Sequence, residues 1–351
     1  MQQIVNKLSQ FSIIGLGENS HYVNYPTKYR IELFKLLSQQ SNFNTIFLET
    51  DIFYASIINA YIHSIIDSDP FILVQNIFYM WHSSNIVNFI KWLRNYNKYA
   101  DQSRKIFFIG FDSQNPFFFR KNKYISKSLI KDTLKYYQKI FNISSDTFKK
   151  LYSFYTTGYE KKYGDTILYD RSRELLSYQI FQLHYQKILP KNSKVCILAH
   201  QAHLSKIKSK SFPHGPFGYY ISKHFKKNYI SIGMDILTGK LACKKILKGI
   251  NINYGIKLIK FNNVQLIDNN YHYSNECDSS LSQYTINPLK YHDAVLVFTN
   301  DTPYTSNNSY FKSHILSKLQ KFIKNKKFDL KLFYKKYKVD IPNKLILVLL
   351  S

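Results

Sequence analysis

The sequence has few of the residues that cross-link a chain or interrupt its secondary structure. Its 351 residues include only 3 cysteines, 11 glycines, 9 prolines and 2 tryptophans. Three cysteines without a CxxC pair do not make a disulfide framework and are typical of a reducing compartment. No apolar run reaches the ~18 residues of a membrane span, and no secretory signal pattern opens the chain. We therefore expect a cytoplasmic protein without a membrane span.

Acidic residues are also scarce. Asp and Glu total 22 against 49 Lys and Arg, which gives a formal net charge of +27. Such a charge attracts nucleic acids, anionic membranes or acidic partners. The lysines are spread along the chain at amphipathic spacing, and none of the usual nucleic-acid-binding motifs is present. We expect no nucleic-acid binding and keep an acidic peptide or carrier protein as a candidate partner.

Apolar residues, in contrast, make up 45% of the chain, enough for a sizeable core. Six short, nearly continuous apolar runs predict strands at residues 12–18, 45–50, 105–112, 194–200, 229–236 and 293–300. Helical spacing predicts helices over 27–40, 85–99 and 165–189. Because continuously apolar strands are buried on both faces, the pattern predicts an α/β fold with a mostly parallel or mixed sheet flanked by helices.

No linker rich in Gly, Ser or Pro divides the chain, so we predict a single domain over residues 1–351. Residues 115–164 are Lys-rich and aromatic without a strand pattern, which predicts a helical cap insertion. Residues 301–351 are expected to form a Lys-rich helix and a final strand.

Ionisable and polar side chains follow four of the predicted strands at the point where each strand ends. They are Glu18 and His21, Glu49 and Asp51, Asp112 and Gln114, and His200 and His203. Ligands of open α/β sheets bind in the crevice beyond the carboxyl ends of the strands, so these side chains are expected to share one site. Arg30, early in the first predicted helix, would supply the cation that buried carboxylates need.

At these residues the sequence resembles the erythromycin esterase family. The resemblance rests on "GLGENSH" (15–21), Arg30, "IFLE" (46–49), "MWHSSNIVNFIKWLRNYN" (80–97), "IGFDSQ" (109–114), "RSRELLSYQ" (171–179), "LAHQAHL" (198–204) and residues 216–240. Each motif is weak alone, but their order and spacing hold over roughly residues 12–240. Beyond residue 240 there is no reliable resemblance.

The resemblance implies catalytic residues at Glu18, His21, Arg30, Glu49, His200 and His203. Asp112, Gln114 and Trp81 are predicted to bind substrate. The chain departs from the family pattern where Asn85 replaces a Glu, where Gln201 replaces an Asn, and where Arg173-Glu174 replaces an Arg-Asp pair. These departures bear on the substrate more than on the hydrolytic residues.

The resemblance further implies metal-independent hydrolysis of an ester or lactone without a cofactor. No Gly-x-Ser-x-Gly elbow is present, which argues against a serine nucleophile. His21 would act as the general base that activates water, because an imidazole titrates near neutral pH. Glu49 and Glu18 would orient His21 or the water, and Arg30 would keep these carboxylates ionised. His203, together with His200, would donate to the oxyanion.

Four alternatives remain open at this point. The first is a macrolide-type lactone hydrolase that confers antibiotic resistance. The second is a related enzyme of natural-product biosynthesis that acts on a modified peptide or carrier-bound ester, which the departure at Asn85 and the positive charge favour. The third is a non-catalytic basic binding protein on the same fold. The fourth is metal chemistry, since the same carboxylates and imidazoles could ligate a divalent ion, although Arg30 argues against it.

Overall fold

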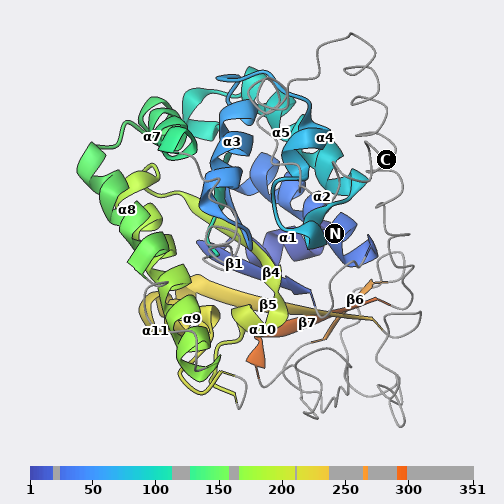
Figure 1. Cartoon of the computed structure of the whole chain (residues 1–351). Coiled ribbons are helices and arrows are strands. Elements are labelled where there is room, and N and C mark those ends of the chain that lie inside the picture. Colours follow the sequence, from blue (N-terminus) through green and yellow to red (C-terminus); the bar gives the residue numbers. More distant parts are fainter. Residues whose placement is uncertain are drawn as a thin grey trace, which may run out of the picture.

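The computed structural model describes residues 1–18, 24–112, 127–157, 166–209, 212–236, 264–267 and 291–298. Within these ranges a seven-stranded sheet has the order β3-β2-β4-β1-β5-β7-β6 (Figure 1). The strands are β1 (Ile13–Glu18), β2 (Phe43–Leu48), β3 (Phe107–Gly110), β4 (Lys194–His200), β5 (Tyr229–Ile236), β6 (Val264–Ile267) and β7 (Ala294–Phe298).

The pairing is parallel from β3 through to β7, and only the edge strand β6 runs antiparallel to its neighbour β7. The predicted α/β fold with a mostly parallel sheet is thus confirmed, and all six predicted strands are present. The short edge strand β6 was not predicted. β1 lies between β4 and β5, and its last residue, Glu18, is in register with His200 at the end of β4.

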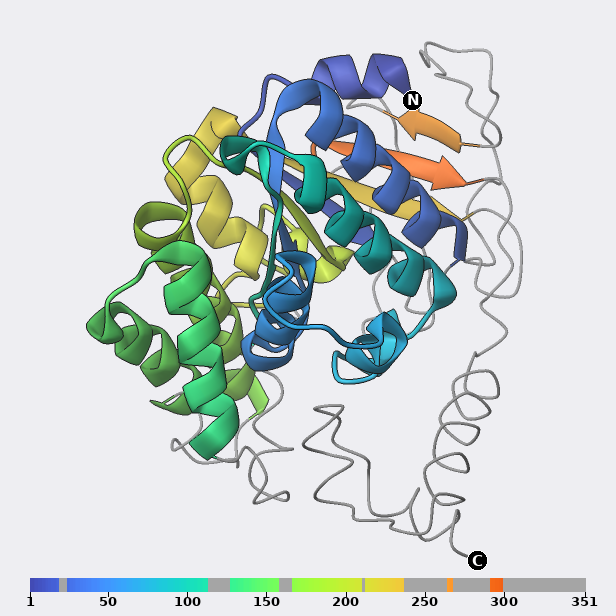
Figure 2. The same ribbon diagram turned by 90° about the horizontal axis from the view of Figure 1, so that it is seen from above.

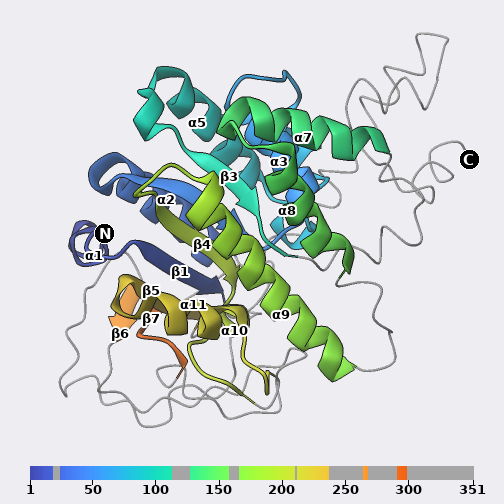
Figure 3. The ribbon, with the colours of Figure 1, turned by 90° about the vertical axis from the view of Figure 1, so that its left-hand side faces the viewer.

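Helices cover the sheet on both faces. The described helices are α1 (Gln2–Leu8), α2 (Asn24–Ser41), α3 (Ile52–Ile62), α4 (Pro70–Val74), α5 (Ser84–Tyr99), α7 (Lys127–Phe141), α8 (Ser145–Thr157), α9 (Thr166–Leu183), α10 (Gln201–Leu204) and α11 (Phe217–Phe225). Short turns of helix occur at Tyr79–Trp81, Gln102–Arg104, His184–Ile188 and Lys226–Asn228. α2 and α5 cover one face (Figure 2), and α9 and α11 cover the other (Figure 3). No helix in the described ranges is both long and apolar enough to span a bilayer.

The segment predicted as a helical cap contributes α7 and α8, and its role as a cap insertion stays a prediction. α7 packs against α3, where the hydroxyls of Ser56 and Thr133 lie 3.1 Å apart, and α8 packs against α9. The limits of the insertion stay a prediction, because residues 113–126 and 158–165 lie outside the described residues. The predicted helix and strand within 301–351 also lie outside them.

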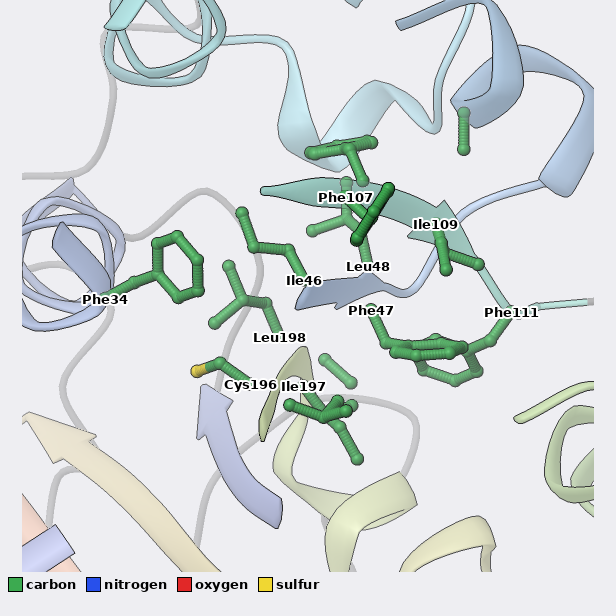
Figure 4. Packing of buried hydrophobic residues seen from close by; sticks show 14 of the residues in the cluster. Phe34, Ile46, Phe47, Leu48, Phe107, Ile109, Phe111, Cys196, Ile197 and Leu198 are labelled. Carbon is green, nitrogen blue, oxygen red and sulfur yellow. The ribbon is translucent and has the colours of Figure 1, made fainter. Parts of the chain in front are cut away.

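Side chains of β2 alternate between two apolar layers, one on each face of the sheet (Figure 4). The ring of Phe47 packs with its centroid 4.9 Å from that of Phe181 on α9 and 6.5 Å from that of Phe111. Ile46 points the other way, toward Phe34 of α2. Successive residues of a strand face opposite sides, so a strand that is apolar at every position needs helices on both sides.

A close approach at Gly17 brings α10 against the end of β1. A Cβ atom at this position would lie 2.5 Å from the Cα atom of Gln201, well inside van der Waals contact. The absence of a side chain therefore lets the first residue of α10 lie directly over β1. This contact places the residues that follow β4 beside the carboxyl end of β1.

The central position of Phe47 predicts a large loss of stability on truncation. Phe47→Ala should lower the free energy of unfolding by about 3–5 kcal/mol, because it removes a fully buried ring and leaves a cavity. Tyr99→Ala is the matched control, since Tyr99 is 74% exposed and its loss should cost no more than ~0.5 kcal/mol. Urea unfolding followed by circular dichroism measures both. Equal losses in the two variants would contradict this packing.

Candidate functional site at the carboxyl ends of the strands

The connections that follow the neighbouring strands β1 and β4 lead to helices on opposite faces of the sheet. The chain passes from β1 into α2 on one face, and from β4 through α10 into α11 on the other. This is the topological switch point at which open α/β sheets bind their ligands, at the carboxyl ends of the strands. Glu18, Glu49, Asp112 and His200 all lie at this edge, as the sequence predicted, and all four are at least nine-tenths buried.

The first polar cluster pairs Glu18 with Arg30 of α2. Arg30 is fully buried, and its Nη2 donates to Glu18 Oε2 and to Thr27 Oγ1, the latter at 3.1 Å. The guanidinium lies over the indole of Trp81, with Cζ 5.0 Å from the ring centroid. A buried carboxylate is stable here because a cation faces it.

Trp81 links this pair to the end of β2. The indole is 2% exposed, and its Nε1–H donates to the main-chain oxygen of Glu49 at 2.9 Å. Trp81 is therefore packed between Arg30 and the backbone that carries Glu49. Its predicted contact with substrate stays a prediction.

Glu49 is the centre of the second cluster, and three donors from different elements surround its carboxylate. The backbone N–H of His200 donates to Oε2 at 2.7 Å. Arg173 Nη2 on α9 lies 3.2 Å from Oε1, and His203 Nε2 on α10 lies 3.3 Å from the same oxygen. The orientation of the Glu49 side chain is thus fixed by β4, α9 and α10 together.

Arg173 also forms a two-point contact with Asp112 at the end of β3. Its Nε donates to Oδ1 at 3.0 Å, and its Nη2 donates to Oδ2 at 2.7 Å. Burial opposes the charge of Arg173, but Asp112, Glu174 and Glu49 together raise its pKa well above the ordinary value. Arg173 is therefore a permanent cation that holds two strand-end carboxylates in place. The predicted binding of substrate by Asp112 stays a prediction.

His203 contacts carboxylates through both ring nitrogens. Nδ1 lies 2.8 Å from Glu174 Oε1, on the opposite side of the ring from Glu49. Burial lowers the pKa of His203, but the charges of Glu174 and Glu49 outweigh it and raise the pKa to about 10. The ring of Phe212 packs edge-on against it, with centroids 5.6 Å apart. His203 is therefore a charged imidazolium at neutral pH.

His200 is arranged differently from His203. Its Nδ1 accepts a hydrogen bond from the backbone N–H of Ala202 at 3.3 Å, so His200 caps α10. A ring nitrogen that accepts carries no proton, which places the ring hydrogen on Nε2. The two histidine rings are 6.3 Å apart between centroids. One of the pair is thus held as a neutral tautomer while the other is charged.

Asp51 is a buried carboxyl group beside the site. Its Oδ1 accepts the backbone N–H of Phe53 at 2.7 Å and so caps α3, while Oδ2 has no hydrogen-bond partner among the described residues. Burial, together with the charge of Asp112, raises the pKa of Asp51 to about 7, although backbone hydrogen bonds oppose the shift.

Arg173 and Glu174 are the site residues that sequence reasoning missed. The sequence showed them only as a departure from a family motif. The other residues of the helix did not indicate which of its faces points toward the ends of the strands. Two adjacent ionisable residues of opposite sign in an amphipathic helix were the available signal. His21 and Gln114, in contrast, were predicted but lie outside the described residues.

Within the described ranges, no group of three or more His, Cys, Asp or Glu residues is arranged to hold a metal ion. Glu18, Glu49, Asp112 and Glu174 each face arginine or histidine nitrogens. In chemical terms the arrangement offers fixed carboxylates, the guanidinium groups of Arg30 and Arg173, the imidazolium of His203 and the imidazole of His200. These groups suit proton transfer and the stabilisation of a developing negative charge.

Comparison with known proteins agrees with the resemblance found in the sequence. A family model described as erythromycin esterase matches residues 38–179, which confirms the relationship to that family. The matched segment contains Glu49, Trp81 and Asp112 as well as Arg173 and Glu174. No curated protein sequence matches the chain significantly.

Solved structures share the fold. A Bacillus cereus protein aligns with a TM-score of 0.62 and 15% identity over 86% of this chain and 91% of that chain. A succinoglycan biosynthesis protein aligns with a TM-score of 0.60 and 15% identity over the same shares. An erythromycin esterase variant in its open conformation aligns with a TM-score of 0.48 and 16% identity over 86% of this chain and 94% of that chain. At these identities the likeness extends to the fold alone.

The raised pKa of Asp51 predicts that Asp51→Asn increases the free energy of unfolding, and that the increase depends on pH. Because the folded-state pKa lies above the ordinary 3.8, the fold loses stability as pH rises from about 4 to about 7. Each pH unit in this window costs at most about 1.4 kcal/mol for one proton. Asn keeps the acceptor for Phe53 and carries no charge, so the variant should exceed the wild type in unfolding free energy at pH 8 but not at pH 4.

Urea unfolding at the two pH values measures this difference. Asp69→Asn is the matched control, because Asp69 caps α4 in the same way, through Phe71 N at 3.0 Å, but is only half-buried. An equal effect of Asp51→Asn at both pH values would contradict the assignment.

Proposed function

We propose that this erythromycin esterase-like chain is a hydrolase that cleaves an ester or lactone of a macrolide-type or other natural product with a water molecule activated by His21. The observation that carries the proposal is the fixed position of Glu49. Donors from β4, α9 and α10 hold both of its carboxylate oxygens at the switch point of the sheet. A carboxylate locked in this way can orient a catalytic base or a water without reorganising during the reaction.

His21 is the base in this proposal. It follows Glu18 by three residues, so the chain allows its backbone to lie at most about 11 Å from that of Glu18. Glu18 forms an ion pair with Arg30. Glu49 follows β2, which is separated from β1 by the single strand β4. Either carboxylate would orient the imidazole and stabilise its charge after it accepts a proton.

The reaction balances with water as the only co-reactant. His21 takes one proton from water as the oxygen bonds to the acyl carbon, and the carbonyl oxygen becomes an oxyanion. His200 is the donor we assign to this oxyanion, because its Nδ1 accepts the Ala202 N–H and its Nε2 carries the hydrogen. The bond to the leaving oxygen then breaks, and that oxygen takes the proton from His21. The products are a carboxylic acid and an alcohol, which for a lactone are two ends of one opened ring.

The proposal predicts turnover that depends on His21 and Glu49. The panel consists of erythromycin A, smaller lactones, 4-nitrophenyl esters and esterified peptides, incubated with and without EDTA and followed by mass spectrometry. The wild type should add one water to at least one compound, and EDTA should not reduce the rate. His21→Ala and Glu49→Gln should each lower kcat at least 100-fold, since general-base catalysis contributes about 10²–10⁴-fold.

Two surface variants serve as matched controls. His224→Ala removes an exposed histidine on α11, and Glu32→Gln removes an acidic residue paired with Lys35 on the surface of α2. Both should retain wild-type rates. Turnover of esterified peptides but not macrolides would favour a biosynthetic role. A folded wild type that hydrolyses nothing in the panel would contradict the proposal and favour a binding protein, and a rate abolished by EDTA would contradict the metal-free mechanism.

A further inference from the structure

His203 cannot act as the proton acceptor of this site in the arrangement described. Both of its ring nitrogens face carboxylate oxygens, Glu174 Oε1 at 2.8 Å and Glu49 Oε1 at 3.3 Å. An ionised carboxylate only accepts hydrogen bonds, so Nδ1 donates to Glu174, and Nε2 lies within ion-pair distance of Glu49, where a hydrogen on this nitrogen is favoured. The His203 side chain is 11% exposed, so most of its surface contacts protein.

Glu174 sets this geometry, because its two carboxylate oxygens accept hydrogen bonds from different elements. Oε1 accepts from the His203 ring, and Oε2 accepts the backbone N–H of Phe217 at 2.7 Å, at the first residue of α11. A carboxylate at the N-terminus of a helix is stabilised by the helix dipole. α11 thus fixes Glu174, and Glu174 fixes His203.

We propose that Glu174 is a positioning residue of the hydrolytic site, which holds His203 as a double hydrogen-bond donor with Nε2–H directed at Glu49. His203 then orients Glu49 and does not supply the oxyanion contact that the sequence led us to expect of it. This inference rests on the proposed hydrolase function for its effect on the reaction, but the Glu174–His203–Glu49 arrangement itself does not.

The surrounding charges are consistent with this role. From α9, Glu174 and Arg173 face His203, while Glu49 faces it from the end of β2 and the neutral His200 from the end of β4. Burial and Arg173 disfavour the imidazolium, and the two carboxylates outweigh them, which leaves the pKa at about 10. A cation held in this way can fix Glu49 across the whole neutral range of pH.

The test is a long-range ¹H–¹⁵N NMR spectrum of the histidine side chains, which separates doubly protonated rings from the two neutral tautomers. The His203 signal is assigned by its loss in His203→Asn. In the wild type at pH 8 both ring nitrogens should be protonated. In Glu174→Gln the pKa of the ring should fall by more than one unit, and in Glu174→Asp it should fall less, because the charge is retained at a shorter reach. Glu32→Gln should leave the spectrum unchanged.

Kinetics with 4-nitrophenyl butyrate test the link to the reaction. Glu174→Gln should lower kcat by about 100-fold with KM little changed, as expected when a catalytic group is displaced by about 1 Å. As the pH is raised, the rate of Glu174→Gln should begin to decline at a lower pH than the rate of the wild type. Glu174→Asp should restore part of kcat. If Glu174 had a purely structural role, Glu174→Gln would not shift the pH profile and Glu174→Asp would not restore part of kcat.

The outcomes separate the two proposals. A neutral His203 ring in the wild type at pH 8 would overturn the inference whether or not any ester is hydrolysed, and it needs no variant to fold. A protonated ring with unchanged kcat in folded Glu174→Gln would overturn the positioning role. A protonated ring in a protein that hydrolyses no ester would overturn the proposed function and leave the Glu174–His203 pairing intact.

Discussion

The arrangement depends on the neutralisation of Glu49, a carboxylate buried where the central strands end. An unpaired charge in such a place costs several kcal/mol, so Glu49 needs partners in the folded state. They come from three separate elements: the backbone of His200 after β4, Arg173 on α9 and His203 on α10. The same contacts that satisfy Glu49 therefore align two strands and two helices.

The fold creates the place for this network, and the network in turn supplies the chemistry. Gly17 allows α10 to lie over the end of β1, which brings the residues after β4 beside Glu18. Trp81 joins the Glu18–Arg30 pair to the main chain of Glu49. Fixed charges with defined partners, enclosed by helices on both faces of a parallel sheet, are what a preorganised polar site requires. The structure thus contains a preorganised polar site, for which we propose ester hydrolysis.

Much of this was predictable from the sequence, for identifiable physical reasons. Strands buried on both faces are continuously apolar, which revealed six of the seven described strands, whereas the four-residue edge strand β6 carries too short a pattern. Because parallel strands end at one edge, the sequence placed Glu18, Glu49, Asp112 and His200 together. Arg173 and Glu174 were not predicted, because the orientation of their side chains depends on how α9 is rotated against the sheet. Tertiary packing determines this rotation. The expectation that His203 donates to an oxyanion stays a prediction, and it was made without Glu174, whose contact with His203 the sequence did not reveal.

We propose that this network directs water to an acyl carbon. The most direct test is hydrolysis of the preferred ester in H₂¹⁸O by the wild type and by Glu49→Gln, with mass analysis of both products. We expect one ¹⁸O atom in the carboxylic acid, none in the alcohol, and little product from the variant. Label in the alcohol, or equal turnover by the variant, would contradict it.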